Sequence, residues 1–147
     1  MAFSRNKEQA HMVLALAATQ SAEVLFYFPT ASRIKRYFAV PSVAEAADAS
    51  KVLDVTFVNE GTDGSGTDTL AVLTNDSDLD SDLTRVSGAW AAHTGKALNT
   101  EDRPTGGATT NVADEIEAGS TIKCTVAKAA STATGNVLVG IEYVEST

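Results

Sequence analysis

Residues 24–41 of this chain, VLFYFPTASRIKRYFAVP, decide the fold class. The first five of them, 24–28, are apolar or aromatic at every position, so Phe26 and Tyr27 would point to opposite sides of a β-strand. A strand with two apolar faces is typical of the centre of a sheet, or of a strand that another chain covers. Pro29 ends this strand because proline cannot donate a hydrogen bond to the ladder.

The second half of the segment predicts another strand, from residue 33 to residue 40. Its side chains are expected to point alternately to one side and to the other. One side is expected to present Ile34, Phe38 and Val40, and the other Arg33, Lys35 and Tyr37. Arg36 interrupts the apolar side and is expected near a rim.

The same period of two recurs along the chain, between turns rich in glycine, serine, threonine and aspartate. Strands are expected at 53–57, 67–73, 121–126 and 137–143, with one short strand near 96–98. Residues 9–18 fit a strand or an extended arm, and their alanines and leucines leave a helix as a close alternative. Seven or eight short strands predict an all-β fold, an antiparallel β-sandwich that is jelly-roll-like and has an extended N-terminal arm. Residues 1–20 are then the arm or first strand, and 21–147 a single β-sandwich domain.

Composition limits the classes of function. The 147 residues suffice for one domain and carry a formal net charge of −8. An acidic chain repels a phosphate backbone, so direct nucleic-acid binding is not expected. No apolar run approaches the roughly 18–20 residues of a membrane span, so no membrane contact is expected. Residues 1–40 carry a net charge of +3 and the remainder −11, which suits contact with an acidic neighbour.

Residues suited to metal binding or catalysis are few. Aspartates at every second position of the tract 76–82 resemble the opening of a calcium loop, but Ser81 and Ser87 stand where that loop needs glycine and glutamate. We expect a solvated tract, with no metal and no cofactor. The two histidines have no evident catalytic partner, and Cys124 lies on a predicted inward face, where a thiol acts as a small hydrophobe. The chain is therefore not expected to be an enzyme.

Other side chains suggest contacts with further protein chains. Arg5 and Lys7 lie in the N-terminal arm, and free chain ends are usually mobile unless they dock on a partner. The candidates for contact are Phe3, Arg5, Lys7, Phe26, Tyr27 and Trp90. The alternatives are that the apolar ones complete the core of a single chain and that the arm has no role. Because one chain has few ways to cover both faces of 24–28, a homo-oligomer is expected.

Two segments resemble a known family. Residues 24–57, VLFYFPTASRIKRYFAVPSVAEAADASKVLDVTF, and residues 115–144, EIEAGSTIKCTVAKAASTATGNVLVGIEYV, are similar to the two halves of small structural proteins from tailed-phage head modules. The shared pattern is an apolar strand, a proline turn, I-x-R/K-x-x-A-V, an alanine-rich loop and a closing V-x-V-x-I/V-x-Y strand. These proteins are jelly-roll-like capsid decoration, or cement, proteins.

The resemblance covers about residues 21–144 and implies a function. It implies a structural virion protein that binds the outer capsid surface and stabilises contacts between subunits of the major capsid protein. It also implies a homotrimer on the outer face of the capsid, made in the host cytoplasm, with no catalytic residues to carry over.

A second hypothesis is a phage tail, fibre or baseplate module of the same sandwich type. Such a module would bind a host-surface glycan through an aromatic platform flanked by acidic or amide groups. Trp90, near His93 and Asn99 in the sequence, is the candidate for that platform.

Overall fold

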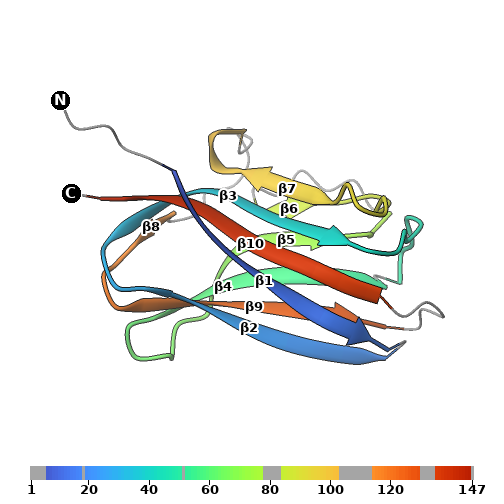
Figure 1. The fold of residues 1–147 in the computed structure, drawn as a ribbon, viewed down its shortest axis with the longest axis horizontal. Helices are drawn as coiled ribbons and strands as arrows, with labels where there is room; N and C mark the ends of the chain where they lie inside the picture. The colour runs from blue at the N-terminus through green and yellow to red at the C-terminus, as the bar shows by residue number, and fades with distance from the viewer. Residues whose placement is uncertain are drawn as a thin grey trace.

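The computed structural model describes residues 6–17, 19–50, 52–77, 84–102, 114–129 and 135–146, which form two packed β-sheets (Figure 1). The first sheet has the order β1 (Lys7–Leu16), β10 (Gly135–Glu145), β3 (Ser32–Pro41) and β7 (Lys96–Asn99), and β8 (Glu115–Ile116) also pairs with β3. The second sheet has the order β2 (Gln20–Phe28), β9 (Ser120–Lys128), β4 (Leu53–Gly61), β5 (Asp68–Thr74) and β6 (Arg85–Val86). A short 3₁₀ turn, η1 (Thr100–Asp102), follows β7.

The strand pairs are nested along the chain. β4 pairs with β5, β3 with β7, β2 with β9 and β1 with β10, and all four pairs are antiparallel. β6 joins β5 in parallel. Nested pairs shared between two facing sheets define a jelly roll. The predicted all-β antiparallel β-sandwich of jelly-roll type is therefore confirmed.

The core lies between the two sheets and is built from the alternating residues of their central strands. The second sheet contributes Leu53, Val55 and Phe57 of β4 and Ile122, Cys124 and Val126 of β9. The first sheet contributes Val137, Val139 and Ile141 of β10. These inward faces agree with the sequence prediction because their alternation is unbroken over the buried part of each strand.

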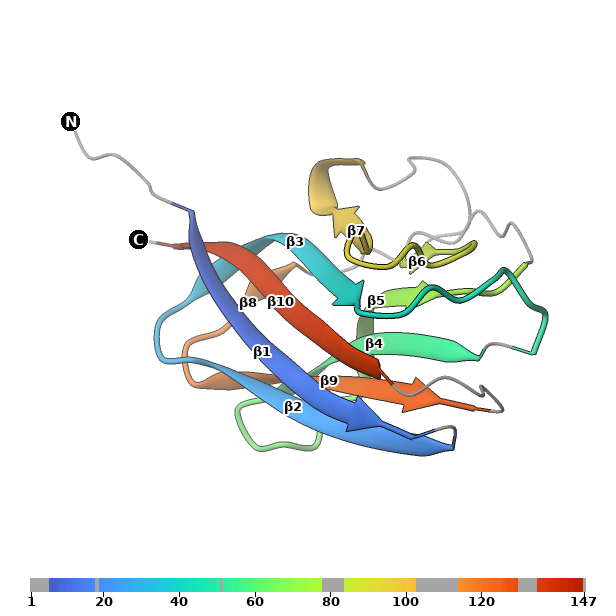
Figure 2. The same ribbon diagram turned by 45° about the vertical axis from the view of Figure 1, so that its right-hand side comes forward.

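Strand β2 lies at the edge of the second sheet as the structure describes it, and not at the centre (Figure 2). Phe26 and Phe28 point inward and are fully buried, whereas Leu25 and Tyr27 each expose 57% of their surface. The predicted central position is wrong, because among the described strands only β9 pairs with β2. The outward apolar side chains of β2 face solvent. Coverage by another chain stays a prediction.

A β-bulge in β3 corrects the predicted orientation of its side chains. Arg36 pairs with Glu142 of β10 and Ile34 pairs with Tyr143, so Lys35 is one extra residue on β3. An extra residue inverts the alternation beyond it. Tyr37 is therefore buried in the core, although the sequence predicts it on the side opposite Ile34.

Strand β1 realises the strand interpretation of residues 9–18. Its register with β10 shifts between Val13 and Leu16, where Ala15 has a left-handed φ of 49°. Both Val13 and Leu16 point inward and are buried. Met12 and Leu14 point outward and expose 52% and 70% of their surface.

Candidate functional site on the outer face of the first sheet

The register of the first sheet aligns the outward side chains of its strands in rows. One row, polar throughout, contains Glu8, Glu142, Arg36 and Asn99. The next two rows contain Ala10, Gly140, Phe38 and Ala97, and then Met12, Leu138 and Val40. A charged row therefore lies directly beside two apolar rows. We call this surface the outer face of the first sheet.

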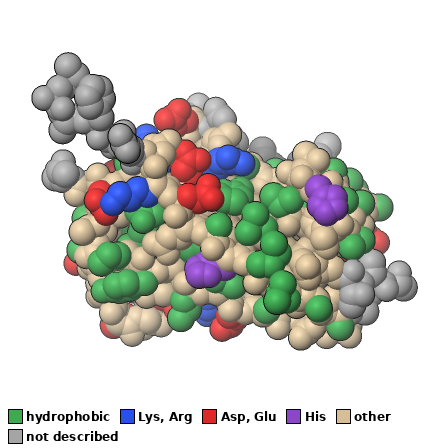
Figure 3. Space-filling view, in the orientation of Figure 1, with side chains coloured by type: hydrophobic (Ala, Val, Ile, Leu, Met, Phe, Trp, Pro, Cys, Tyr) green, Lys and Arg blue, Asp and Glu red, His purple; other side chains and the backbone are tan. Residues whose placement is uncertain are grey.

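The same division is visible on the molecular surface. In Figure 3, acidic and basic side chains gather toward the end of the molecule where the N-terminus emerges, and apolar side chains run beside them. On this face, the exposed large apolar side chains are those of Met12 and Leu14, on the edge strand β1. Exposed apolar surface next to a polar rim is typical of a protein–protein interface.

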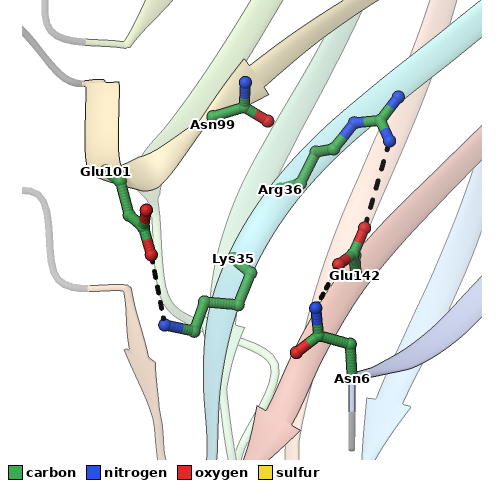
Figure 4. A pocket seen from close by; sticks show the side chains of 6 residues that line it. All are labelled: Asn6, Lys35, Arg36, Asn99, Glu101 and Glu142. Carbon is green, nitrogen blue, oxygen red and sulfur yellow. Dashed lines mark hydrogen bonds and ion pairs between the residues drawn. The ribbon is translucent and has the colours of Figure 1, made fainter.

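The bulge in β3 places two cations on this face. Lys35 and Arg36 are adjacent in the sequence, yet both line one polar pocket of about 480 Å³ together with Asn6, Asn99, Glu101 and Glu142. Lys35 extends toward Glu101 of η1, and Arg36 extends toward Glu142 of β10 (Figure 4). A regular strand would have sent one of the two cations to the other face.

The ion pairs in this pocket are long. Arg36 Nη1 lies 3.9 Å from Glu142 Oε2, and Lys35 Nζ lies 3.6 Å from Glu101 Oε1. Asn6 Nδ2 donates a shorter hydrogen bond, 2.6 Å, to Glu142 Oε1. Long, partly exposed pairs contribute little to stability and are screened by salt. Charges of a binding partner can therefore replace them at small cost.

The Phe38 ring joins the charged row to the apolar rows. Phe38 lies on the outer face but is nearly buried, because it covers Gly140 of the neighbouring strand. A Cβ atom at Gly140 would overlap the ring, so glycine is required for this packing. The Arg36 guanidinium stacks over the same ring with its Cζ 5.0 Å from the ring centroid. This packing holds Arg36 in place at the pocket.

The sequence-predicted contact residues of the N-terminal arm are only partly described. Phe3 and Arg5 lie outside the described residues. Lys7 begins β1, and its Nζ donates a 2.5 Å hydrogen bond to Glu145 of β10. This bond raises the pKa of Lys7 and lowers the pKa of Glu145. Lys7 is therefore held by its own chain and is not the free basic group that the sequence suggests.

The remaining predicted contact residues divide into buried and exposed. Phe26 is buried between the sheets, and Trp90 exposes 1% of its surface, with Nε1 donating a 3.1 Å hydrogen bond to the Leu53 carbonyl. Both residues complete the core of one chain, which corrects the prediction that they contact others. Because its ring is buried, Trp90 also offers no platform for a glycan. Tyr27 is exposed, as a contact residue requires.

The tract 76–82 begins inside the protein, which corrects the expectation that it is solvated throughout. Asn75 is fully buried, with Oδ1 accepting from the Leu53 N–H at 3.1 Å and Nδ2 donating to the Ala46 carbonyl at 2.8 Å. Asp76 is 2% exposed, and Arg85 Nη1 lies 3.6 Å from its Oδ2. The other three aspartates of the tract lie outside the described residues, within which no three acidic, histidine or cysteine side chains could hold a metal ion.

Calcium is expected to leave the stability unchanged, since Asp76 already has a cationic partner. Thermal unfolding in millimolar calcium chloride and in excess chelator should give the same Tm, because a ligand that binds the folded state raises Tm. A calcium-dependent rise of several degrees would contradict this prediction and point to the three aspartates at positions 78, 80 and 82.

Two arrangements missed by the sequence prediction contribute to the outer face. Met12 and Leu14 have no contact role in the sequence prediction. Phe38 is expected there on the same side as both Ile34 and Arg36, whereas the bulge leaves it beside Arg36 and opposite Ile34. The signal for a bulge was present, since Lys35 and Arg36 together interrupt the alternation. Which of the two residues is extra depends on the pairing with β10.

Comparisons with known proteins add little. No family model and no curated protein matches the sequence. Among solved structures, the VP2 subviral particle of infectious bursal disease virus matches with a TM-score of 0.23 and 11% identity, over 97% of this chain and 42% of that chain. Structures of the Gt and Gx strains of that virus match with TM-scores of 0.22 and 0.20, at 9% and 10% identity, over 97% and 95% of this chain and 42% and 40% of those chains. The chain thus spans about two fifths of the length of the chains it matches.

No helix in the described part of the chain is long and apolar enough to cross a bilayer. TM-scores as low as those above carry no argument about function. The function must be argued from the residues of this chain, and above all from the outer face of the first sheet.

Proposed function

We propose that this protein is a structural virion protein of the capsid-decoration type, which binds the major capsid protein on the outer capsid surface. The observation that carries the proposal is the outer face of the first sheet, where Met12 and Leu14 are exposed beside a charged row. The jelly-roll fold and the resemblance of residues 21–144 to phage decoration proteins support it. Its work would be to hold adjacent capsid subunits together.

The chemistry of this face suits a stable contact with a protein. Burying a large apolar side chain contributes about 1.5–3 kcal/mol, so Met12 and Leu14 can supply a substantial part of the binding energy. Lys35, Arg36 and Glu142 can form new ion pairs with the partner and set its orientation. The present partners of these charges are weakly held, as described above.

Substitution of both exposed apolar residues, Met12→Glu with Leu14→Glu, is expected to weaken capsid binding at least tenfold. The physical reason is that two charges would have to lose water in the interface. The measurement is co-sedimentation of purified protein with capsids that lack it, over a range of protein concentrations. Circular dichroism checks that the variant keeps its strands.

A matched control is Thr69→Glu, an exposed strand position on the second sheet. This control should bind capsids as the unmodified chain does. Equal binding by the Met12/Leu14 double variant would remove the outer face of the first sheet from the contact. No binding of the unmodified chain to any capsid preparation would refute the decoration role.

A second candidate function is a tail, fibre or baseplate module that binds a host-surface glycan. The pocket favours it, because two amides, two carboxylates and two cations can together hydrogen-bond the hydroxyl and acidic groups of a sugar. The test is a glycan array probed with the unmodified chain and with Arg36→Gln. Absence of binding on the array, or binding that Arg36→Gln retains, would argue against the pocket as a glycan site.

A further inference from the structure

Strand β2 presents a long edge that pairs with no described strand and that β1 touches through the Gln9 side chain. Its nine residues pair with β9 from Gln20 opposite Lys128 to Phe28 opposite Ser120 without a register shift. Natural edge strands are normally protected by bulges, prolines or several charges, since free N–H and C=O groups otherwise pair with another strand. Glu23 is the one charged residue of β2.

The direction of the free backbone groups follows from two hydrogen bonds. The Phe28 carbonyl accepts from Gly119, on the β9 side of the strand. The Tyr27 carbonyl accepts from Gln9 of β1, on the opposite side. Because these directions alternate in an antiparallel pair, the backbone groups of Glu23, Leu25 and Tyr27 point to the edge away from β9, where the Tyr27 carbonyl already has Gln9 as a donor. These are also the residues whose side chains are exposed on the outer face of the second sheet.

We infer that β2 pairs antiparallel with β2 of a second copy of this chain, about a two-fold axis that passes beside Leu25. Leu25 then lies opposite the second copy's Leu25, and Glu23 lies opposite the second copy's Tyr27. The second sheets of the two copies join into one continuous sheet. This pairing buries the exposed surface of Leu25 and Tyr27 and gives backbone partners to Glu23 and Leu25. At Tyr27, the N–H of the second copy's Glu23 replaces the Gln9 side chain as donor to the carbonyl.

The pattern of charge and side chains on β2 favours a second copy as the occupant. A chain with a net charge of −8 repels its own copies over most of its surface, and β2 is a stretch with a single charge. The register about Leu25 keeps the two Glu23 side chains apart and places the two Leu25 side chains opposite each other. Lys123, whose Nζ lies 2.9 Å from Glu60, stands next to Leu25 on β9 and adds a positive charge near Glu23.

The edge geometry distinguishes a two-fold pair from the trimer that the family resemblance implies. A three-fold ring needs two different surfaces to meet, such as β2 and the opposite edge of the same sheet. That opposite edge is β6, which has two residues in the described structure. The described part of this edge is too short to cover the nine residues of β2.

The first experiment measures the mass of the isolated chain, without capsids, so its failure is separate from failure of the proposed function. Sedimentation equilibrium at about 1–100 µM is expected to show a species of twice the 15.3 kDa chain mass. The fraction of chains in this species should grow with concentration. A single-chain mass over the whole range, or a mass of three chains, would overturn the inference.

Cysteine substitution tests the register. In an antiparallel pair with reciprocal hydrogen bonds, the Cα atoms lie about 5.5 Å apart, within disulfide reach. Leu25→Cys is therefore expected to form a disulfide-linked dimer under mild oxidation, whereas Glu23→Cys, which would face Tyr27, is not. Cys124 is buried and stays out of the reaction, because burial raises the pKa of its thiol. A dimer in which Leu25→Cys does not cross-link would refute this pairing.

Proline substitution tests the backbone contact. Leu25→Pro removes an N–H that points away from β9 and leaves the ladder with β9 intact. The variant should therefore fold and stay a monomer in sedimentation equilibrium. If circular dichroism shows that this variant has lost its strands, Leu25→Lys replaces it, since two lysines opposite each other repel. Dimers that persist in a folded variant with either change would overturn the inference.

Discussion

Replacement of Trp90 by alanine is expected to lower the free energy of unfolding by about 3–5 kcal/mol, as for other large buried aromatic residues. The ring is almost fully buried and its Nε1 bonds the Leu53 carbonyl on β4. The backbone of Trp90 also exchanges hydrogen bonds with Glu45, and the Lys96 ammonium lies 5.2 Å from the ring centroid. The residue therefore ties two connecting segments to the second sheet.

Urea unfolding of Trp90→Ala and Trp90→Phe measures this effect. The phenylalanine variant keeps most of the buried ring and removes one of two donors to the Leu53 carbonyl, which also accepts from the Asn75 N–H at 3.3 Å. A smaller loss of about 0.5–1.5 kcal/mol is therefore expected. If Trp90→Ala were as stable as the unmodified chain and failed to bind capsids, Trp90 would be a contact residue, as the sequence alone suggests.

Replacement of Asp76 by alanine is expected to cost about 3–5 kcal/mol, because it leaves the Arg85 charge without its buried carboxylate partner. Asp76 is 2% exposed and the Arg85 side chain is 21% exposed. Asp76 begins the acidic tract and Arg85 follows it, so this pair fixes the two ends of the segment that connects β5 to β6.

A double variant distinguishes the ion pair from mere loss of packing. Asp76→Ala combined with Arg85→Met should be more stable than Asp76→Ala alone, because the cation whose carboxylate partner at position 76 was removed is then gone as well. Asp68→Ala, at an exposed aspartate of β5, serves as control and should change stability by less than about 0.5 kcal/mol. An Asp76→Ala variant as stable as this control would show that the tract is solvated from its first residue.

The sequence predicts the parts of this fold where alternation is regular. Residues 120–128 alternate between buried and half-buried positions throughout β9, so its inward face could be predicted correctly. In β3, the one-residue bulge at Lys35 depends on how β10 pairs with it, and β10 lies about a hundred residues later in the chain. The adjacent Lys35 and Arg36 interrupt the alternation, but the pattern alone does not show that one of them is an extra residue, so the sequence predicts Tyr37 and Phe38 on the wrong sides relative to Ile34.

The candidate site could be predicted only in part, for a similar reason. The exposed position of Tyr27 agrees with the two apolar faces of 24–28. Whether β2 is central or at an edge depends on strand order, which alternation does not encode. The burial of Trp90 depends on a bond to Leu53, 37 residues away, which the sequence around Trp90 does not reveal.

The nested strand order has a consequence for when the protein can act. The outermost pair, β1 with β10, joins residues as far apart as Lys7 and Glu145, which are separated by 138 positions. β10 lies between β1 and β3, so the outer face of the first sheet does not exist until β10 has left the ribosome. Distant pairings also form slowly, because a long loop must close before they contribute. A nascent chain therefore cannot present the proposed binding face, and the attachment proposed here would have to follow synthesis.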